Sequence, residues 1–196
     1  SLGNGIDPLE MAEKYGADAL RFNLITGNSP GNDMRFYVEK CEAMRNFCNK
    51  IWNASRFVMM NLTIDHVELP KKLELEDKWI LSKLNRSGAM TDNLDHYEMG
   101  LAAAKINSFI WDVYCDWFIE LTKNRLNSED QTARENAQNV LCYVLIETLK
   151  LLHPFMPFIT EEIWQALPHE GEFLMLSKWP EYNEKFSFPA EEEAMQ

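Results

Sequence analysis

The most regular part of the sequence is the segment 36–62, in which mostly apolar positions recur at intervals of four and three residues. An α-helix places such positions on one stripe of its surface, which it then buries against other elements. The segment therefore predicts a long helix that packs on other helices. The positions of the stripe are Tyr37, Cys41, Met44, Cys48, Ile51, Ser55, Val58 and Leu62.

The same periodicity predicts three more long helices, at about 75–94, 97–125 and 132–153. The helix expected at 97–125 is apolar almost all round, which predicts that it is the most buried of the four. Pro154 and Pro157 break the last long helix, and Pro157 can open one further short helix. Four long helices joined by short loops, without alternating strands, predict an all-α fold, an antiparallel helical bundle.

Shorter elements are expected at both ends of the chain. At the N-terminus, Asp7 is a good N-cap and Pro8 fits the first position of a short helix, which ends at Gly16. A second short helix follows and leads into a turn cluster at 27–33. The C-terminal residues predict a small irregular tail that includes a brief extended run at 173–176.

The composition excludes several classes of protein. The chain has 196 residues, of which 46% are hydrophobic and 12% aromatic, and this is too apolar for a disordered chain. The longest apolar runs are a few residues, so no membrane span is expected, and no secretory signal opens the chain. The four cysteines are far apart and predict buried, reduced thiols in a cytoplasmic protein.

The charge is strongly acidic, with 31 acidic residues against 19 basic ones and a formal net charge of -12. Such an excess argues at first sight against a nucleic-acid partner. The charge is unevenly distributed, however, because residues 154–196 hold two basic and nine acidic side chains, whereas the segment 36–62 is net positive. Since binding depends on the local field, the total charge does not exclude a nucleic acid.

Signatures of catalysis and of metal binding are absent from the sequence. It contains no phosphate-binding loop, dinucleotide-binding motif or zinc-protease motif, and its four histidines are isolated, so no metal site is expected. Asp112, Asp116 and Glu120 step by four residues along one helix, and paired carboxylates can do acid–base work. A solvated strip on an otherwise apolar helix explains these residues better.

The face of the 36–62 helix opposite its stripe is unusual. It carries three asparagines, three cations and one aromatic ring, although Asn is a poor helix former that stability alone would not select. Asn amides can pair with base edges, Arg and Lys can bind phosphates, and Phe can stack on a base. The equally supported alternative is that Phe57 packs under a neighbouring helix and that the asparagines cap loops. The candidate contact residues, named the polar face below, are Arg45, Asn46, Asn49, Lys50, Asn53, Arg56 and Phe57, and Glu42 lies on the same side of the helix.

Several longer strings match one protein family. The strings that favour it are 27–36 (GNSPGNDMRF), 45–57 (RNFCNKIWNASRF) and 111–120 (WDVYCDWFIE). Ser1 to Asn4 resemble the end of a KMSKS loop that keeps only its final serine, and residues 15–22 (YGADALRF) resemble the segment that follows this loop. Together these strings resemble the valyl-tRNA synthetases, which are class I aminoacyl-tRNA synthetases. Residues 152–164 (LHPFMPFITEEIW) are similar to the leucyl and isoleucyl enzymes as well.

The resemblance implies a fragment of a longer ligase that attaches valine to its tRNA with ATP and magnesium. Residues 1–34 are expected to hold the end of the KMSKS loop and the stem-contact helices, and residues 35–180 to form the helical anticodon-binding bundle. Residues 181–196 would be an acidic tail that leads to an absent C-terminal arm. The catalytic and editing domains would lie upstream, so the fragment needs no cofactor and has no catalytic residue apart from Ser1, which would end the KMSKS loop.

The implied partner is valine tRNA, bound by a cytoplasmic, monomeric enzyme that has no contact with membranes. Two alternatives remain, namely the equivalent domain of an isoleucyl or leucyl enzyme and a helical protein–protein interaction module. Binding by such a module should persist at high salt, because buried contacts are not screened as phosphate contacts are. The expected roles are phosphate contacts for Arg45, Lys50 and Arg56, base-edge contacts for Asn49 and Asn53, and stacking for Phe57.

Overall fold

The computed structural model describes residues 5–26, 31, 35–88 and 90–195, and its regular structure within these ranges is entirely helical. A π-helix, η1 (Phe109–Phe118), joins α6 to α7, and two 3-10 turns, η2 (Leu174–Leu176) and η3 (Glu184–Phe186), lie near the C-terminus. The α-helices are α1 (Pro8–Tyr15), α2 (Ala17–Ile25), α3 (Val38–Asn61), α4 (Leu75–Ser87), α5 (Met90–Asp95), α6 (Met99–Ser108), α7 (Ile119–Leu126), α8 (Gln131–Leu152), α9 (Pro157–Ala166) and α10 (Pro189–Ala194).

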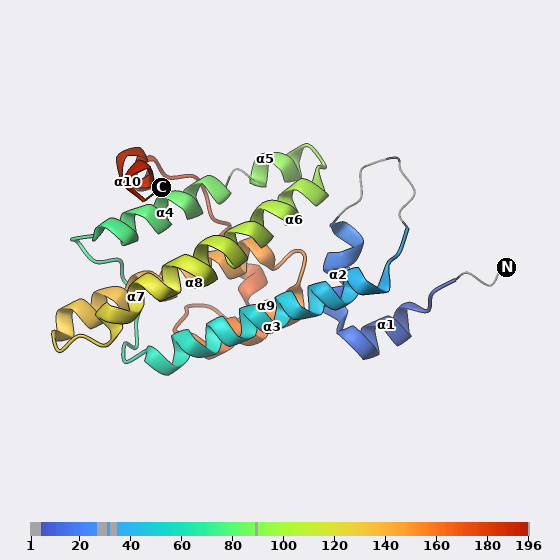
Figure 1. The fold of residues 1–196 in the computed structure, drawn as a ribbon, viewed down its shortest axis with the longest axis horizontal. Coiled ribbons are helices and arrows are strands. Elements are labelled where there is room, and N and C mark those ends of the chain that lie inside the picture. The colour runs from blue at the N-terminus through green and yellow to red at the C-terminus, as the bar shows by residue number, and fades with distance from the viewer. Residues whose placement is uncertain (1–4, 27–30, 32–34, 89, 196) are drawn as a thin grey trace.

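The long helices lie side by side and alternate in direction, whereas α1 and α2 lie at one end of the molecule (Figure 1). The predicted all-α antiparallel bundle is therefore confirmed. Asp7 caps α1 as expected, since its carboxylate accepts a hydrogen bond from the amide of Leu9 at 2.8 Å. The expected KMSKS-loop remnant at 1–4 and most of the turn cluster at 27–33 fall outside the described residues.

The core is organised around α8, which contacts α3, α4, α6, α7 and α9. Eleven of the 22 residues of α8 are buried, compared with three of ten in α6 and four of ten in η1. The expectation that the 97–125 helix would be the most buried is wrong, because solvent covers one flank of it. Leu101 and Trp117 are exposed there, and Trp117 retains 62% of its accessible surface.

The helix predicted at 97–125 has the expected extent, from α6 to the end of α7, but its middle is wider than an α-helix. At the end of η1 the amide of Ile119 bonds to the carbonyl of Tyr114, five residues back. The buried positions Ile110, Tyr114 and Phe118 are spaced by four, which fits the wider turn. Helices of this type are rare and are frequently found at functional sites. Here η1 packs against α3, which carries the polar face.

The helix predicted at 75–94 is instead broken into α4 and α5 at Gly88. The amide of Gly88 still bonds to the carbonyls of Leu84 and Asn85, both at 3.2 Å, and α4 ends there. A Cβ atom on Gly88 would lie only 3.0 Å from the Asn85 carbonyl oxygen, so a larger residue would crowd this turn. Because glycine is also a poor helix former, a continuous apolar pattern across it over-predicts the helix.

The C-terminal residues, expected to form an irregular tail, instead form short helices that pack on the bundle. The run at 173–176, expected to be extended, contains the 3-10 turn η2. Glu192 of α10 is only 4% exposed, and its carboxylate accepts a hydrogen bond from Ser82 at 2.5 Å. It also pairs with Arg86 at 3.0 Å and Lys83 at 3.4 Å, so cations of α4 compensate part of the acidic charge.

Candidate nucleic-acid interface

The centre of the polar face lies on the side of α3 that points away from the core, whereas its edges are partly buried. Four of its seven residues are exposed, and their spacing of three, four and three residues places them on one strip along the middle of the helix. These four are Asn46, Asn49, Asn53 and Arg56. The opposite side of α3 buries Cys41, Phe47, Ile51, Ser55 and Val58.

The three asparagines of this strip do not cap loops. Asn46, Asn49 and Asn53 lie in the interior turns of the 24-residue α3, and their side-chain amides bond to no other described residue. By contrast, Asn61 at the end of α3 donates to the carbonyl of Phe57 at 2.8 Å. Because each interior Asn lowers helix stability, three free amides on one strip favour a hydrogen-bonding ligand as their explanation.

Lys50 lies at the edge of the polar face, between α3 and η1. Its ammonium nitrogen is 2.5 Å from a carboxylate oxygen of Asp116 and 4.1 Å from the centroid of the Trp111 ring. The charge of Lys50 is therefore already paired within the fold, on a side chain that is 25% exposed. A phosphate bound by Lys50 would have to compete with the Asp116 carboxylate.

The other two edge residues are also engaged by neighbouring groups. Phe57 is half-buried and packs against the main core, and the Lys123 ammonium lies 5.8 Å from the centroid of its ring. The Arg45 guanidinium lies 5.6 Å from the ring centroid of Tyr15 and 3.5 Å from the Glu42 carboxylate. Its Nε atom is buried without a hydrogen-bond partner among the described residues. The most accessible part of the polar face is therefore its exposed centre, which consists of Asn46, Asn49, Asn53 and Arg56.

One residue that the sequence analysis did not select lies beside this strip. Trp52 is 39% exposed, and it follows Asn49 by three positions and precedes Arg56 by four, so all three share one side of α3. An indole that is partly in solvent beside an amide and a guanidinium can stack on a base. The signal was an aromatic residue off the apolar stripe, the same criterion that selected Phe57.

The carboxylates of η1 and α7 form a solvated strip, as the preferred interpretation expected. All three are exposed, and each has its own partner. Asp112 accepts from Ser108 at 2.7 Å, Asp116 pairs with the lysine of the polar face, and Glu120 pairs with Lys123 at 2.6 Å. Carboxylates held by separate partners do not form an acid–base pair.

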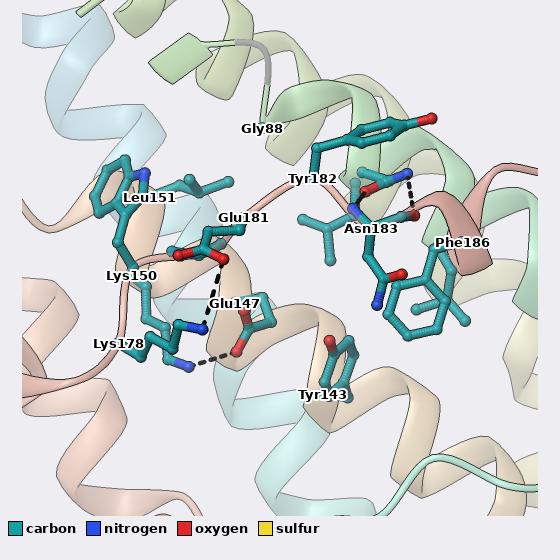
Figure 2. Close-up of a pocket in the computed structure, with 15 residues that line it drawn as sticks. Gly88, Tyr143, Glu147, Lys150, Leu151, Lys178, Glu181, Tyr182, Asn183 and Phe186 are labelled. Atoms are coloured by element: carbon teal, nitrogen blue, oxygen red, sulfur yellow. Dashed lines mark hydrogen bonds and ion pairs between the residues drawn. The ribbon is translucent and has the colours of Figure 1, made fainter. Parts of the chain in front are cut away.

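A pocket of about 460 Å³ lies between α4, α8 and the segment 178–186, and no residue of the polar face lines it (Figure 2). Its charged side chains are paired, Lys150 with Glu147 at 2.5 Å and Lys178 with Glu181 at 3.5 Å, so it offers little free charge to a ligand. The described residues contain no group of three His, Cys, Asp or Glu that could hold a metal ion. Their helices include none that is long and apolar enough to cross a membrane.

Comparison of the sequence with known proteins identifies its family. Residues 77–196 match a family profile described as the anticodon-binding domain of tRNA ligase. The chain belongs to this family. It is 50% identical over 200 residues to a valine–tRNA ligase of Oceanobacillus iheyensis, an alignment that covers all of this chain and 23% of the relative. A valine–tRNA ligase of Listeria innocua is 53% identical over 189 residues, with 94% of this chain and 21% of the relative covered.

Solved structures agree on the fold. The LeuRS–tRNA–LeuAMS ternary complex of Agrobacterium radiobacter K84 superposes with a TM-score of 0.75 at 21% identity, over 95% of this chain and 22% of that one. Methionyl-tRNA synthetase of Mycobacterium tuberculosis with methionyl-adenylate gives a TM-score of 0.67 at 21% identity, over 83% of this chain and 34% of that one. The chain spans less than a quarter of the length of the two valine–tRNA ligases.

Proposed function

We propose that this anticodon-binding domain is the anticodon-recognition module of a valine–tRNA ligase and that its partner is valine tRNA. Identities of 50% and 53% to two valine–tRNA ligases, against 21% to the LeuRS structure, support valine over leucine. In this proposal residues 1–34 hold the end of the KMSKS loop and the stem-contact helices, and residues 35–180 form the bundle. Residues 181–196 lead toward a C-terminal arm.

The observation that carries the proposal is the exposed centre of the polar face on α3. An anticodon loop presents unstacked bases and a phosphate backbone, and single-stranded loops are what proteins read in RNA by sequence. No described residue bonds to the amides of Asn49 and Asn53 or to the guanidinium of Arg56, so these groups can contact base edges and a phosphate. The ring of the exposed Trp52 can stack on a base. Arg45 and Lys50 lie at the two edges, each beside a carboxylate of this chain with which a phosphate would have to compete.

The full-length ligase would join valine to the 3′ end of its tRNA with ATP and magnesium, as a monomeric cytoplasmic enzyme. This chain would supply none of the reacting groups. It would bind the anticodon far from the chemistry, so that part of the binding energy depends on the correct tRNA. Binding by the isolated chain should be weak, because its net charge is -12 and Lys50 is already paired with Asp116.

The polar face can be tested by combining Asn53→Ala with Arg56→Ala in the full-length ligase. Losing a base-edge contact and a phosphate contact should lower kcat/KM for tRNA by about 10-fold or more, without changing the rate of valyl-adenylate formation. Lys185→Ala is the matched control, because it removes one exposed positive charge on η3, outside α3. An unchanged kcat/KM in the double variant would show that Asn53 and Arg56 do not contact the anticodon, which contradicts the role proposed for this face.

Two further measurements refine the assignment. Trp52→Ala should lower the affinity for tRNA at little cost in unfolding free energy, because Trp52 is exposed. Phe57→Ala should lower the unfolding free energy more than the affinity, because Phe57 packs against the core. Binding of tRNA should also fall steeply between 50 and 200 mM salt, on the order of 10-fold or more for a few phosphate contacts. Binding of tRNA that does not fall over this range would contradict the phosphate contacts proposed for this face.

A further inference from the structure

Two side chains of α2 reach the turn between α8 and α9, more than 130 positions away in the sequence. Asp18 is buried, and its carboxylate accepts hydrogen bonds from the backbone amides of Ile159 at 2.7 Å and Phe158 at 3.3 Å. These amides belong to the first turn of α9, where no intrahelical acceptor exists. A carboxylate at a helix N-terminus satisfies them and also interacts favourably with the helix dipole.

Arg21, one turn further along α2, binds the same turn with the opposite polarity. Its Nε donates to the carbonyl of Phe155 and its Nη2 to the carbonyl of Pro154, both at 3.2 Å. The next residue, Phe22, is fully buried and packs on Phe155 with ring centroids 6.1 Å apart. Thus α2 both donates hydrogen bonds to one short turn and accepts hydrogen bonds from it. These contacts connect the two strings that resemble synthetase motifs, 15–22 and 152–164.

From these contacts we propose that Asp18 and Arg21 form a latch that fixes the orientation of α1 and α2 on the anticodon-binding bundle. They are positioning residues and do not contact tRNA themselves. The inference rests on the proposed function, in which the catalytic region precedes α1. Because one tRNA must then reach the catalytic site and the bundle together, the angle at which α1 and α2 leave the bundle decides whether both ends fit.

Apolar packing anchors α2 through Phe22 in the main core, but it holds α1 only through a much smaller cluster. The apolar cluster that α1 shares with α2 and α3 has only three buried members, Tyr15, Ala19 and Cys41. Apolar contacts are non-directional, whereas hydrogen bonds require aligned donors and acceptors. The four bonds of the latch therefore supply the directional part of the contact. Burial raises the pKa of Asp18, and the amides of Ile159 and Phe158 oppose that rise, so the carboxylate is held by its bonds against the cost of its desolvation.

A matched pair of residues elsewhere separates positioning from ordinary helix capping. Asp130 caps α8 by accepting from the amide of Thr132 at 2.9 Å. Arg134 donates to the carbonyls of Ser128 at 2.5 Å and Glu129 at 3.0 Å. This pair has the same chemistry as the latch, but it connects residues within six positions of one another. Asp130→Ala with Arg134→Ala is therefore the control for Asp18→Ala with Arg21→Ala.

The orientation can be measured in the 196-residue chain with spin labels on Glu13→Cys in α1 and Glu162→Cys in α9, both exposed positions. Labelling should favour these sites, because burial raises the pKa of the native Cys48, Cys115 and Cys142 thiols to about 12. The unaltered latch should give one narrow distance distribution, and the Asp18→Ala, Arg21→Ala variant a broad one. The control variant should stay narrow. A narrow distribution in the latch variant, or equal broadening in the control, overturns the latch.

If the double alanine variant does not fold, Arg21→Lys provides the same test. Lysine keeps the charge but lacks the planar fork that holds two carbonyls at once, so the distribution should broaden less. An unchanged distribution in a folded Arg21→Lys variant would count against the latch.

In the full-length ligase, the latch variant should lower kcat/KM for tRNA by about 10- to 100-fold, mainly through kcat, as expected when reacting groups are misplaced. The affinity of the isolated chain for the tRNA should not change, since the polar face is intact. Unaltered aminoacylation by a variant with a broadened distribution would refute the positioning role. A wild-type full-length ligase whose kcat/KM for tRNA does not depend on the anticodon sequence would refute the proposed function and leave the distance result standing.

Discussion

The helices α3 and α4 both present polar side chains away from the core, yet they use them differently. On α4, Lys78, Lys83 and Arg86 all pair with carboxylates of α10. On α3, Arg56 and the three asparagines have no such partners among the described residues. Polar groups that stabilise a fold are matched inside it, whereas groups left unmatched on a helix that they destabilise are available to another molecule. The comparison therefore assigns a structural role to the cations of α4 and a role in recognition to the unmatched polar side chains of α3.

The variant with the largest expected effect on this comparison is Arg125→Met, which removes the partner of a buried carboxylate on α4. Asp77 is fully buried, and its carboxylate lies 2.7 Å from the Arg125 guanidinium. Removing one partner of a buried ion pair leaves an uncompensated charge, which costs about 3–5 kcal/mol of unfolding free energy. Urea denaturation followed by circular dichroism measures this loss.

The control for this change is Lys123→Ala, which breaks the exposed ion pair with Glu120 and should cost less than about 1 kcal/mol. If Arg125→Met cost no more than Lys123→Ala, the polar groups of α4 would not be structural. The contrast with α3 would then be lost.

The second test is Glu192→Ala, at the contact between α10 and α4. This change leaves the buried Ser82 hydroxyl without the acceptor that it now reaches at 2.5 Å, which should cost about 2 kcal/mol. The midpoint of thermal unfolding gives the effect. Glu193→Ala, on an exposed residue of the same helix, should leave the midpoint nearly unchanged. Equal effects would mean that the acidic residues of α10 act only through their total charge.

The third test runs in the opposite direction, on α3. Replacing Asn49 and Asn53 together by alanine should raise the unfolding free energy by up to about 1 kcal/mol, because alanine is the better helix former at exposed positions. The same variant should lower the affinity for tRNA. A variant that loses stability would show that these amides support the fold, which would remove the difference between α3 and α4.

The sequence predicted α3 better than α4, and the reason is the range of the interactions involved. The stripe and the polar face of α3 follow from local periodicity, which a single helix expresses by itself. The burial of Glu192 depends on Ser82, 110 positions away, so a run of three glutamates gave no sign of it. The pairing of Lys50 with Asp116 likewise depends on how η1 packs on α3, which periodicity does not encode. The break at Gly88, by contrast, has a local cause, because glycine is a poor helix former.

The smallest expected effect is a difference in pH dependence, which arises on α4 and not on the polar face. Burial raises the pKa of Asp77 above its ordinary value of 3.8, and Arg125 opposes that rise. In the unfolded chain Asp77 then ionises first as the pH rises, which stabilises the unfolded state. The stability that Asp77 contributes is therefore full below pH 3.8 and is lost as the pH rises through the folded-state pKa.

Relative to Asp77→Asn, the unfolding free energy of the wild type should thus decline as the pH is raised from about 4, and then level off. In an Arg125→Met background the decline should be larger and extend to higher pH, since the opposing charge is gone. The Asn49→Ala, Asn53→Ala variant should follow the wild-type curve with a constant offset, because neither amide titrates. Urea midpoints at several pH values measure all four curves. A difference between wild type and Asp77→Asn that rises with pH would mean that Arg125 outweighs the burial of Asp77, and that the α4 pair stabilises the fold through its charge.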